Sequence, residues 1–556
     1  MFKKRIFTLM ATCAFIVSLS AQSAAYEWRG CMIDVSRHFF SVDFLKKQID
    51  AFQDIGINKL HLHLTDAAGW RLEIKRYPLL TSKAAWRTQE DWNKWWVNND
   101  RRYASEFTPG AYGGYYTQEQ MRDLVAYAAD RGVEIVPEIE MPGHSEEVLA
   151  TYPKLACNGI FDGQGDLCPS NDLTVQFMQN VLDEVMSIFP SPYIHIGGDE
   201  ASMAAWEKCA SCSQRKAELG IKSNQELQDH FVREMMQYVI SKGRKPIAWD
   251  EALCEGLPKG SVIMVWRGLE KAQHAVDLGY DVILSPSAYC YLDYYQDAPI
   301  VEPYAFGTYL PLEQTYLLKD ALIDSPHVLG VQGNLWTEFI PTGAHAEYML
   351  YPRIIAIAEI GKAGKEIEPF KEFRFNTLHT LNQLSQNGYN TFDLRTEQGH
   401  RSESLVDIVN RASKGRVIYN QPMNETYPAS GENALIDGKR GDWNHNDKRW
   451  QGFKGKNCLD VTVDLRKAIE ISSVGMDFMQ SDVAWIYLPS ELTIALSADG
   501  KTYNEVANFK IVKRPSNRLF FQNLGWTGKQ KARYIHIVAS SPTPDDWIFL
   551  DEILVK

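Results

Sequence analysis

Short apolar runs alternate with segments of helical periodicity between residues 29 and 361, and few folds accommodate such an alternation. The apolar runs span residues 30–35, 59–64, 133–139, 193–196, 246–249, 262–266, 281–284 and 328–333. The clearest helical segments between them span residues 42–55, 117–131, 173–189 and 225–242. Strands and helices that alternate in this way predict an α/β fold, a closed parallel (β/α)8 barrel.

The predicted helix at residues 117–131 has local signals at both ends. Thr117 followed by Gln120 is a capping-box pattern, in which each side chain accepts a hydrogen bond from the other residue's backbone. Gly132 follows the helix and provides a stop signal. The segments after the fifth, sixth and seventh strands have the weakest helical pattern.

The length of 556 residues predicts more than one domain. Residues 1–25 have a basic start, an apolar run and small residues, which predicts a signal peptide and export to the periplasm or outside. Residues around Cys13 match a lipoprotein signal poorly, so we do not expect lipid anchoring, and no later stretch is apolar enough to span a membrane. We assign residues 26–365 to the barrel, residues 366–430 to a closing helix and linker, and residues 431–556 to a small all-β sandwich.

Composition excludes one class of partner and favours another. The 58 Lys and Arg residues against 70 Asp and Glu residues give a net charge of −12, which disfavours nucleic acid as a ligand. The chain contains 15 Trp and 26 Tyr, many of them beside Gly, Asp or Asn at predicted strand ends. Aromatic rings in such places suit the faces of sugars, although a large core would use many as well.

Two pairs of cysteines are candidates for cross-links. Cys157 and Cys168 flank a Gly- and Asp-rich loop and could form a disulfide, which an exported protein allows. Cys209 and Cys212 have a spacing that suits zinc, but no second pair of that kind is visible. We therefore expect a local disulfide or free thiols, and no metal. Four other cysteines read as buried strand or loop residues: Cys31, Cys254, Cys290 and Cys458.

Polar and aromatic residues gather directly after the predicted strands. Because chemistry in a (β/α)8 barrel occurs at the carboxyl ends of the strands, these residues predict one shared site. Charged residues fill loops in any protein, but that does not explain the repeated tryptophans at strand ends. The residues are Arg37, Asp66, His144, Asp199, Glu200, Trp249, Trp266, residues 285–293, and Trp336 to Glu338.

The pair Asp199-Glu200, after Gly197-Gly198 at the end of the fourth strand, is the centre of this pattern. Glycoside hydrolysis requires a carboxylic acid to protonate the departing oxygen and a second group to support the positive charge at C1. Neighbouring residues of a strand point to opposite faces, so both carboxylates can serve one site only if the strand ends there. Two glycines in front of them permit that change of direction.

Several motifs in sequence order over residues 29–361 make the chain resemble glycoside hydrolase family 20, the β-N-acetylhexosaminidases. They are residues 30–39 with Asp34 and Arg37, residues 59–71 with His61, His63 and Asp66, residues 137–144, the Gly-Gly-Asp-Glu stretch, Trp249-Asp250-Glu251, Tyr291-Leu292-Asp293, residues 334–338, and Pro352-Arg353.

The resemblance implies a retaining exo-enzyme that removes terminal β-linked N-acetylglucosamine or N-acetylgalactosamine without a cofactor. Glu200 would act as general acid and then base, and Asp199 would bind the N–H of the substrate's 2-acetamido group. Tyr291 would hydrogen-bond the acetamido oxygen, which is itself the nucleophile and forms an oxazolinium intermediate. Release of a disaccharide, as in lacto-N-biosidases, and an inactive glycan-binding barrel are the alternatives.

The resemblance also implies a set of residues that contact the sugar. Arg37 could instead form a structural ion pair, any one tryptophan could simply pack in the core, and the Trp-rich insertion at residues 86–96 could be a subsite or a surface loop. His61 and His63 read as structural, and His144 has no second histidine at ligand spacing. The implied set is Arg37, Asp66, His144, Trp249, Trp266, Asp293, Trp336 and Glu338, of which Asp66 and His144 would stand behind Glu200 and tune it.

The C-terminal part resembles the discoidin-like, coagulation-factor C-type domains. The motifs are Leu435 to Gly438, Trp450, Val463-Asp464-Leu465, Leu488-Pro489, and Ser497 to Gly500. Domains of this kind often bind glycans, sometimes with calcium, so calcium is a candidate structural ion here. A purely structural role is the alternative, because the fold alone does not establish binding.

Overall fold

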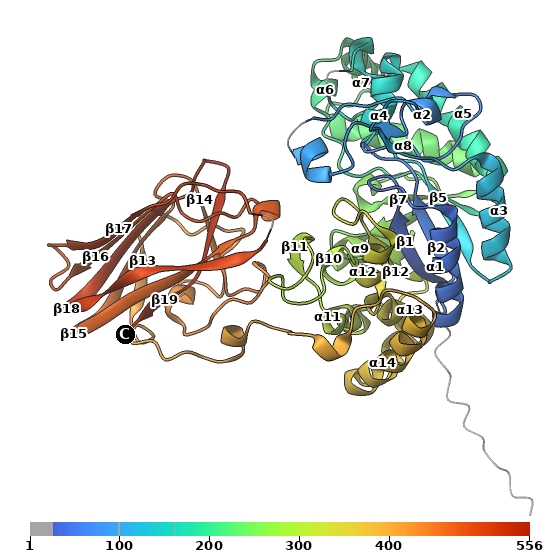
Figure 1. The fold of residues 1–556 in the computed structure, drawn as a ribbon. Coiled ribbons are helices and arrows are strands. Elements are labelled where there is room, and N and C mark those ends of the chain that lie inside the picture. The colour runs from blue at the N-terminus through green and yellow to red at the C-terminus, as the bar shows by residue number, and fades with distance from the viewer. Residues whose placement is uncertain (1–25, 98–99, 162, 517) are drawn as a thin grey trace, which may run out of the picture.

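All eight predicted apolar runs form strands of one closed parallel barrel in the computed structural model, which describes residues 26–97, 100–161, 163–516 and 518–556. The strands close in the order β1-β12-β9-β8-β7-β6-β5-β2, which confirms the predicted (β/α)8 barrel (Figure 1). Their bounds are β1 (Trp28–Asp34), β2 (Lys59–His63), β5 (Glu134–Glu138), β6 (Tyr193–His195), β7 (Lys245–Trp249), β8 (Val262–Val265), β9 (Asp281–Leu284) and β12 (Val328–Leu335).

Helices cover the outside of the barrel, and the four clearest predicted ones are present. The capping box between Thr117 and Gln120 is formed, and Gly132 has a φ of 71° after the helix. After β7 only a 3₁₀ turn follows, at Asp250–Ala252, where the helical pattern was weakest. The helices are α1 (Val42–Ile55), α2 (Leu79–Ser82), α3 (Gln118–Ala129), α4 (Glu146–Thr151), α5 (Asp172–Ile188), α6 (Ala204–Glu207), α7 (Ala210–Leu219), α8 (Asn224–Ser241), α9 (Leu269–Asp277), α10 (Ser287–Cys290), α11 (Leu312–Tyr316), α12 (Gly343–Leu350), α13 (Arg353–Ala363) and α14 (Phe370–Gln386).

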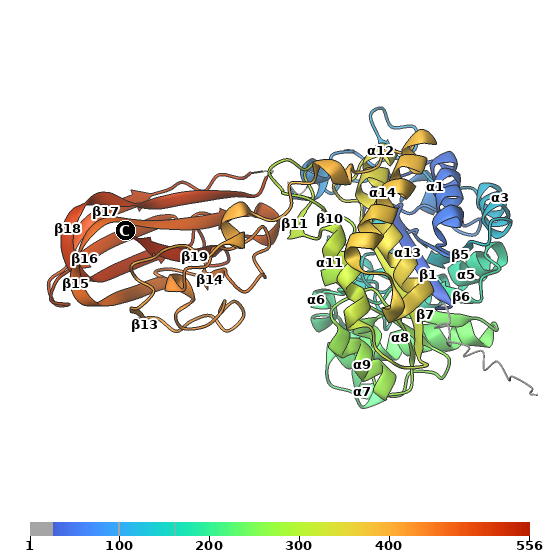
Figure 2. The same cartoon turned by 90° about the horizontal axis from the view of Figure 1, so that it is seen from below.

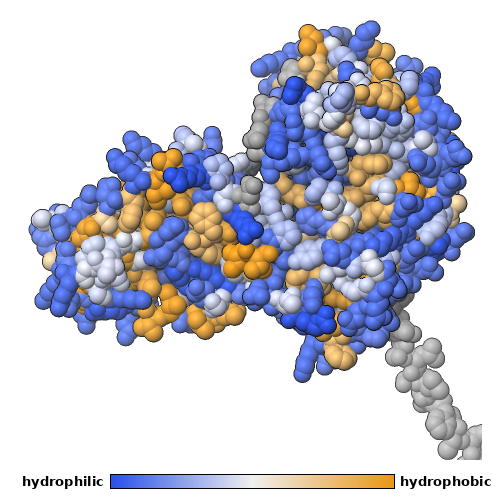
Figure 3. Space-filling view, viewed as in Figure 1, coloured by the Kyte–Doolittle hydropathy of each residue, from blue (hydrophilic) through white to orange (hydrophobic). Residues whose placement is uncertain are grey.

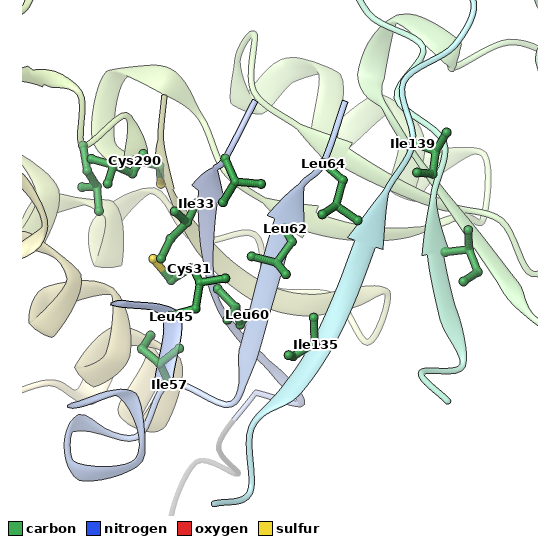
Figure 4. Packing of buried hydrophobic residues seen from close by; sticks show 14 of the residues in the cluster. Cys31, Ile33, Leu45, Ile57, Leu60, Leu62, Leu64, Ile135, Ile139 and Cys290 are labelled. Atoms are coloured by element: carbon green, nitrogen blue, oxygen red, sulfur yellow. The ribbon is translucent and has the colours of Figure 1, made fainter. Parts of the chain in front are cut away.

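Strand β2 shows how the barrel places apolar side chains on its outside and polar side chains on its inside. Leu60 and Leu62 point outward into the apolar cluster that contains Leu45 of α1 (Figure 4). Because side chains alternate along a strand, the intervening His61 and His63 point into the barrel. Both histidines are fully buried there. They therefore belong to the floor of the barrel's functional end, not to its surface.

The C-terminal part is an antiparallel sheet of seven strands, which agrees with the predicted all-β domain. The two longest strands, β15 and β18, pair along most of their length, and the pairing is irregular between Asp464 and Ile469. Val461 lies before that irregularity and Met476 after it, yet both belong to one buried core, so the sheet folds around it. The strands are β13 (Arg416–Tyr419), β14 (Gln451–Lys454), β15 (Leu459–Gln480), β16 (Glu491–Ser497), β17 (Asn504–Lys510), β18 (Phe520–Ser540) and β19 (Trp547–Val555).

The sheet starts earlier in the chain than the predicted boundary at residue 431. Strand β13 pairs with β15. Asn410, which precedes β13, donates a hydrogen bond from its side chain to the backbone carbonyl of Ile553. The end of the predicted linker is thus part of the β domain, because a short strand with little apolar periodicity is stabilised by its pairing partner.

The β domain contacts the side of the barrel where β10 (Tyr294–Tyr295) and β11 (Phe306–Tyr309) lie (Figures 1 and 2). Tyr309 shares an apolar cluster with Trp443 of the β domain. The buried carboxylate of Asp297 accepts hydrogen bonds from the backbone N–H groups of Gln398 and Gly399, at 2.7 and 2.8 Å. The loop after β9 is therefore held by the linker through Asp297 and by the β domain through Tyr309.

The outer surface in Figure 3 is mostly hydrophilic, with apolar residues in scattered groups, as is usual for a folded protein surface. Within the part of the chain that the structure describes, no helix combines the length and apolarity needed to cross a membrane. The predicted signal peptide at residues 1–25 lies outside the described residues.

Candidate active site

The chain turns sharply where β6 ends, and this turn presents Asp199 and Glu200. Gly197 and Gly198 have φ angles of 68° and 103°, and Glu200 itself has a φ of 48°. A Cβ atom on Gly197 would lie 2.0 Å from the Oε1 atom of Glu140, so a larger residue does not fit. Because the strand has ended, both carboxylates lie at the same end of the barrel, as the two glycines predict.

Asp199 and Glu200 differ in their exposure and share a contact with His144. The side chain of Glu200 is 59% exposed, whereas that of Asp199 is only 11% exposed. The Nε2 atom of His144 lies 3.5 Å from Glu200 and 3.7 Å from Asp199. Its Nδ1 atom lies 3.6 Å from the carboxylate of Asp66. Asp66 and His144 are thus placed behind the carboxylate pair, as the resemblance implies.

This arrangement shifts the ionisation of each group. Burial alone would lower the pKa of His144, but the neighbouring carboxylates, Asp66 first, raise it well above its usual value. The hydrogen bond from His144 lowers the pKa of Glu200, and burial raises the pKa of Asp199. The free site therefore holds His144 as a cation and Glu200 as a carboxylate at neutral pH.

Arg37 lies among three carboxylates and one aromatic ring. Its guanidinium is 2.7 Å from Asp66, 3.2 Å from Asp34 and 3.7 Å from Glu338. Its Cζ atom also lies 5.0 Å from the ring centre of Trp336. Burial would lower the pKa of Arg37, but the charges of these carboxylates raise it well above its usual value. Arg37 thus forms the alternative structural ion pair with Asp34, and it also contacts Glu338 within the candidate site.

Three tryptophans from different strand ends form one cluster with Tyr291. Trp266 stacks on Tyr291 with ring centres 6.0 Å apart and planes 24° apart, and Trp336 lies 6.1 Å from Tyr291 on another side. Trp249 lies 6.0 Å from Trp336 and donates its indole N–H to Glu138 at 2.7 Å. Rings at the ends of β7, β8 and β12 thus form one aromatic cluster with this tyrosine, which supports a shared binding surface.

Several polar atoms of the site are buried without a hydrogen-bond partner among the residues that the structure describes. Buried polar atoms in proteins are normally paired, so such atoms indicate a polar ligand. Burial also raises the pKa of Asp293 well above its usual value. The atoms are Arg37 Nε, Asp199 Oδ1, Asp293 Oδ1 and Glu338 Oε2.

Glu138 and Glu140, on which the site rests, are not among the residues predicted from the sequence. Glu138 contacts His61 and His195, at 3.0 and 3.1 Å, and burial would raise its pKa, but the surrounding histidines lower it well below its usual value. Glu140 accepts a hydrogen bond from the N–H of Gly198 at 3.0 Å, and its side chain lies close enough to Asp199 to affect the pKa of that carboxyl. Acidic residues at alternate positions in an otherwise apolar strand are the signal that could have identified them.

The Trp-rich insertion forms a packed arm beside the site. Trp95 is fully buried, and Trp92 stacks on Trp96 at 5.3 Å. Tyr103 donates a hydrogen bond to the carbonyl of Ala67, next to Asp66. Trp92 and Trp95 therefore serve the packing of the arm, and Trp96 remains half-buried.

Three groups of side chains in the described residues could hold a metal by geometry. Two of them are centred on Glu138 and consist of the histidines and carboxylates described above. The third consists of Cys157, Cys168, Cys209 and Cys212, which are all free thiols. The disulfide that the sequence allows between Cys157 and Cys168 is thus not formed, and the Sγ atom of Cys168 lies 3.7 Å from that of Cys212 and 4.0 Å from that of Cys209.

Comparison with known proteins gives two family matches. The sequence model described as "Glycosyl hydrolase family 20, catalytic domain" matches residues 26–363, and the one described as "F5/8 type C domain" matches residues 419–553. The β-hexosaminidase of Porphyromonas gingivalis is 41% identical over 350 residues, which cover 60% of this chain and 43% of that protein. The chain spans about half the length of the first curated relatives that it matches.

Solved structures show the same similarity. The exo-β-N-acetylglucosaminidase of Vibrio harveyi, solved with N-acetylglucosamine, is 31% identical with a TM-score of 0.57, covering 66% of this chain and 59% of that one. The β-N-acetylhexosaminidase of Bacteroides fragilis is 33% identical with a TM-score of 0.57, covering 66% and 72%.

Proposed function

Because the chain belongs to glycoside hydrolase family 20, we propose that it is a retaining exo-β-N-acetylhexosaminidase with substrate-assisted catalysis. Its substrates would be glycans or glycoconjugates that end in β-linked N-acetylglucosamine or N-acetylgalactosamine. Exo action rests on the similarity to the exo-β-N-acetylglucosaminidase of Vibrio harveyi. We also propose export, on the basis of the predicted signal peptide.

One observation carries the proposal: a buried, unpartnered carboxylate oxygen lies beside an exposed carboxylate. Asp199 Oδ1 has no hydrogen-bond partner among the described residues, and Glu200 next to it is open to solvent. A buried acceptor of this kind suits an amide N–H, and an exposed carboxyl suits the oxygen of a leaving group. A sugar with an acetamido group offers both.

In the first step, the carbonyl oxygen of the substrate's acetamido group attacks C1. The C1–O bond to the leaving group breaks, and Glu200 gives its proton to that oxygen. Asp199 accepts the amide N–H and stabilises the positive charge of the oxazolinium that forms. Tyr291 hydrogen-bonds the acetamido oxygen and holds it toward C1. Internal attack of this kind benefits from proximity, and no protein nucleophile is needed.

In the second step, the Glu200 carboxylate takes a proton from water, whose oxygen attacks C1 while the bond between C1 and the acetamido oxygen breaks. Two inversions at C1 give net retention. The low pKa of Glu200 in the free site suits this step, but the first step requires a protonated carboxyl. A bound sugar would cover the exposed side chain, and the resulting desolvation raises a carboxyl pKa, which reconciles the two roles.

The remaining residues of the site suit recognition of the sugar itself. Trp249, Trp266 and Trp336 would enclose the acetamido methyl group and one face of the ring. Arg37, Asp293 and Glu338 would bind hydroxyl groups through the atoms that are unpartnered in the free site. Their placement on five different strand ends requires the complete barrel.

Glu200→Gln tests the acid role. We expect activity on unactivated disaccharides to fall about 10²–10⁴-fold, because the leaving oxygen loses its proton donor. A substrate with a strongly acidic leaving group should lose less in its first step. Glu119→Gln, an exposed change on α3, is the control. Wild-type turnover of a natural disaccharide by Glu200→Gln would remove Glu200 from this role.

Asp199→Asn tests substrate assistance, because it keeps the size of the side chain but removes its charge. Electrostatic stabilisation in a preorganised site is worth about 3–4 kcal/mol, so we expect a fall in kcat of about 10²–10³-fold with a smaller change in KM. A thiazoline mimic of the intermediate should inhibit the wild type far more strongly than the variant. Equal inhibition of two folded proteins would refute the mechanism, as would an α anomer as the first product by NMR.

A further inference from the structure

Four buried cysteines come together behind the candidate active site, from segments far apart in the sequence. Cys157 begins a 3₁₀ turn after α4, and Cys168 lies in the loop before α5. Cys209 is the residue before α7, and Cys212 lies in its first turn. Their exposed fractions are 7%, 2%, 1% and 0% in sequence order, so none is open to solvent.

The distances between the sulfurs are those of one cluster of four sulfur atoms and not of two disulfides. Cys212 Sγ lies 3.7 Å from Cys168 Sγ and 3.9 Å from Cys157 Sγ, while Cys168 Sγ is also 4.0 Å from Cys209 Sγ. All four sulfurs lie within 4.8 Å of one another. A pair of disulfides would give each sulfur one close partner at about 2.05 Å. Here the central sulfurs each have two partners at similar distances.

The spacing matches a tetrahedron of thiolates around one metal ion. A Zn–S distance of about 2.3 Å places the corners of a tetrahedron about 3.8 Å apart. We propose that Cys157, Cys168, Cys209 and Cys212 bind a structural Zn²⁺ ion. Four protein ligands leave no open position, which is typical of structural and not of catalytic zinc.

The surroundings of the cluster suit a negatively charged zinc–thiolate group. Cys209 is the N-cap of α7, and among the described residues this helix has neither a side-chain cap nor an acid in its first turn. The free N–H groups of a helix N-terminus favour negative charge, which the thiolates would supply. Trp206 and Leu227, both fully buried, pack against the sulfurs and exclude water.

The cluster stands next to contacts that hold both active-site turns. Asp166, two residues before Cys168, accepts hydrogen bonds from the N–H groups of Ser202 and Met203, at 3.1 and 2.7 Å. These two residues directly follow Glu200 and Ala201. The N–H of Leu167 donates to the carbonyl of Pro142 at 2.8 Å, on the turn that carries His144. The metal would thus position the Glu200 and His144 turns without touching the substrate.

The first experiment measures metal and thiols in the wild-type protein, purified after export. We expect about one zinc per chain by elemental analysis and native mass spectrometry. All eight cysteines of the described residues should react as thiols once the protein is denatured with a chelator. Disulfides within the cluster and no metal would overturn the proposal, and so would stoichiometric iron in place of zinc. None of these readouts depends on the proposed enzymatic function.

The second experiment removes one ligand. Loss of a residue that only hydrogen-bonds a metal ligand lowers metal affinity ~10–100-fold, so Cys212→Ser, which removes a ligand itself, should lower zinc affinity by more than this. The matched control is Cys458→Ser, directly before β15. Cobalt-loaded wild type should show thiolate-to-cobalt charge transfer, and Cys212→Ser should not. If the variant does not fold, a chelator should lower the wild-type Tm and added Zn²⁺ should restore it. Retained zinc in Cys212→Ser, or a Tm indifferent to chelation and Zn²⁺, would contradict the assignment.

Discussion

Replacement of Gly197 by alanine tests how the turn after β6 positions the carboxylate pair. The φ of 68° at Gly197 is a left-handed conformation, which costs a residue with a Cβ atom about 1–2 kcal/mol. The new Cβ would also lie 2.0 Å from Oε1 of Glu140, which is buried and fixed by the N–H of Gly198. Displacing Glu140 leaves that buried N–H unpaired, at about 1–3 kcal/mol. Together these terms give a loss of about 2–5 kcal/mol in the free energy of unfolding.

Gly132→Ala separates the two terms. Gly132 has nearly the same φ, 71°, but a Cβ there meets nothing within 4 Å. This control should lose only the ~1–2 kcal/mol of backbone strain. The excess loss in Gly197→Ala then measures the contact with Glu140. Because Glu140 lies close to Asp199, a shift of about 1 Å at the site should also lower kcat/KM about 10²-fold in Gly197→Ala alone.

The assays are thermal and denaturant unfolding, together with kinetics on a chromogenic β-N-acetylglucosaminide. A double-mutant cycle with Glu140→Ala checks the cause, since without that side chain the alanine at position 197 should cost no more than in the control. Equal losses of stability and equal activity in Gly197→Ala and Gly132→Ala would refute the reasoning that Glu140 and the turn hold each other in place.

Three further outcomes are expected. Burial raises the pKa of Glu552 to about 8, so between about pH 4.5 and pH 8 the folded protein holds a proton that the unfolded chain has released. The free energy of unfolding should therefore fall as pH rises through this range, by up to about 1.4 kcal/mol per pH unit. Glu552→Gln should flatten the plot of Tm against pH, and an unchanged slope would contradict the shift. Asp297→Ala removes the acceptor of two backbone N–H groups of the linker that leads to the β domain, and should weaken attachment of that linker to the barrel by about 2–5 kcal/mol. We expect faster proteolysis near Gly399 or an earlier thermal transition, and unchanged proteolysis and melting would count against it. Arg37→Lys keeps the charge but loses the planar fork between its carboxylates, so kcat/KM should fall about 10–100-fold; wild-type kinetics would show that the fork is not used.

The order and type of the elements could be predicted from the sequence because they depend on local periodicity. The strands of the barrel and the capped helix at Thr117 each have a pattern within a few residues, and the structure confirms them. Five polar residues follow strands, which was sufficient to predict that they meet: Arg37, Asp66, His144, Asp199 and Glu200. All parallel strands of a barrel end on the same side, so sequence position alone determines their shared location.

The contacts beneath the site depend on tertiary structure. Glu138 is an ordinary strand residue until the barrel closes and brings His61 and His195 against it from neighbouring strands. The link between Glu140 and Gly197 is of the same kind. Ionisation follows these contacts, since desolvation and neighbouring charges are fixed only by packing.

The cysteines show the same division most clearly. The zinc-like spacing of Cys209 and Cys212 was visible in the sequence, but the second pair, Cys157 and Cys168, has no regular spacing and suggested a local disulfide. Folding brings sulfurs that are 44 and 55 residues apart to within 4 Å of each other. Local sequence patterns determine how one segment folds. The cluster of four cysteines depends on the relative positions of three segments that follow β5 and β6, and these positions are fixed only when the barrel closes.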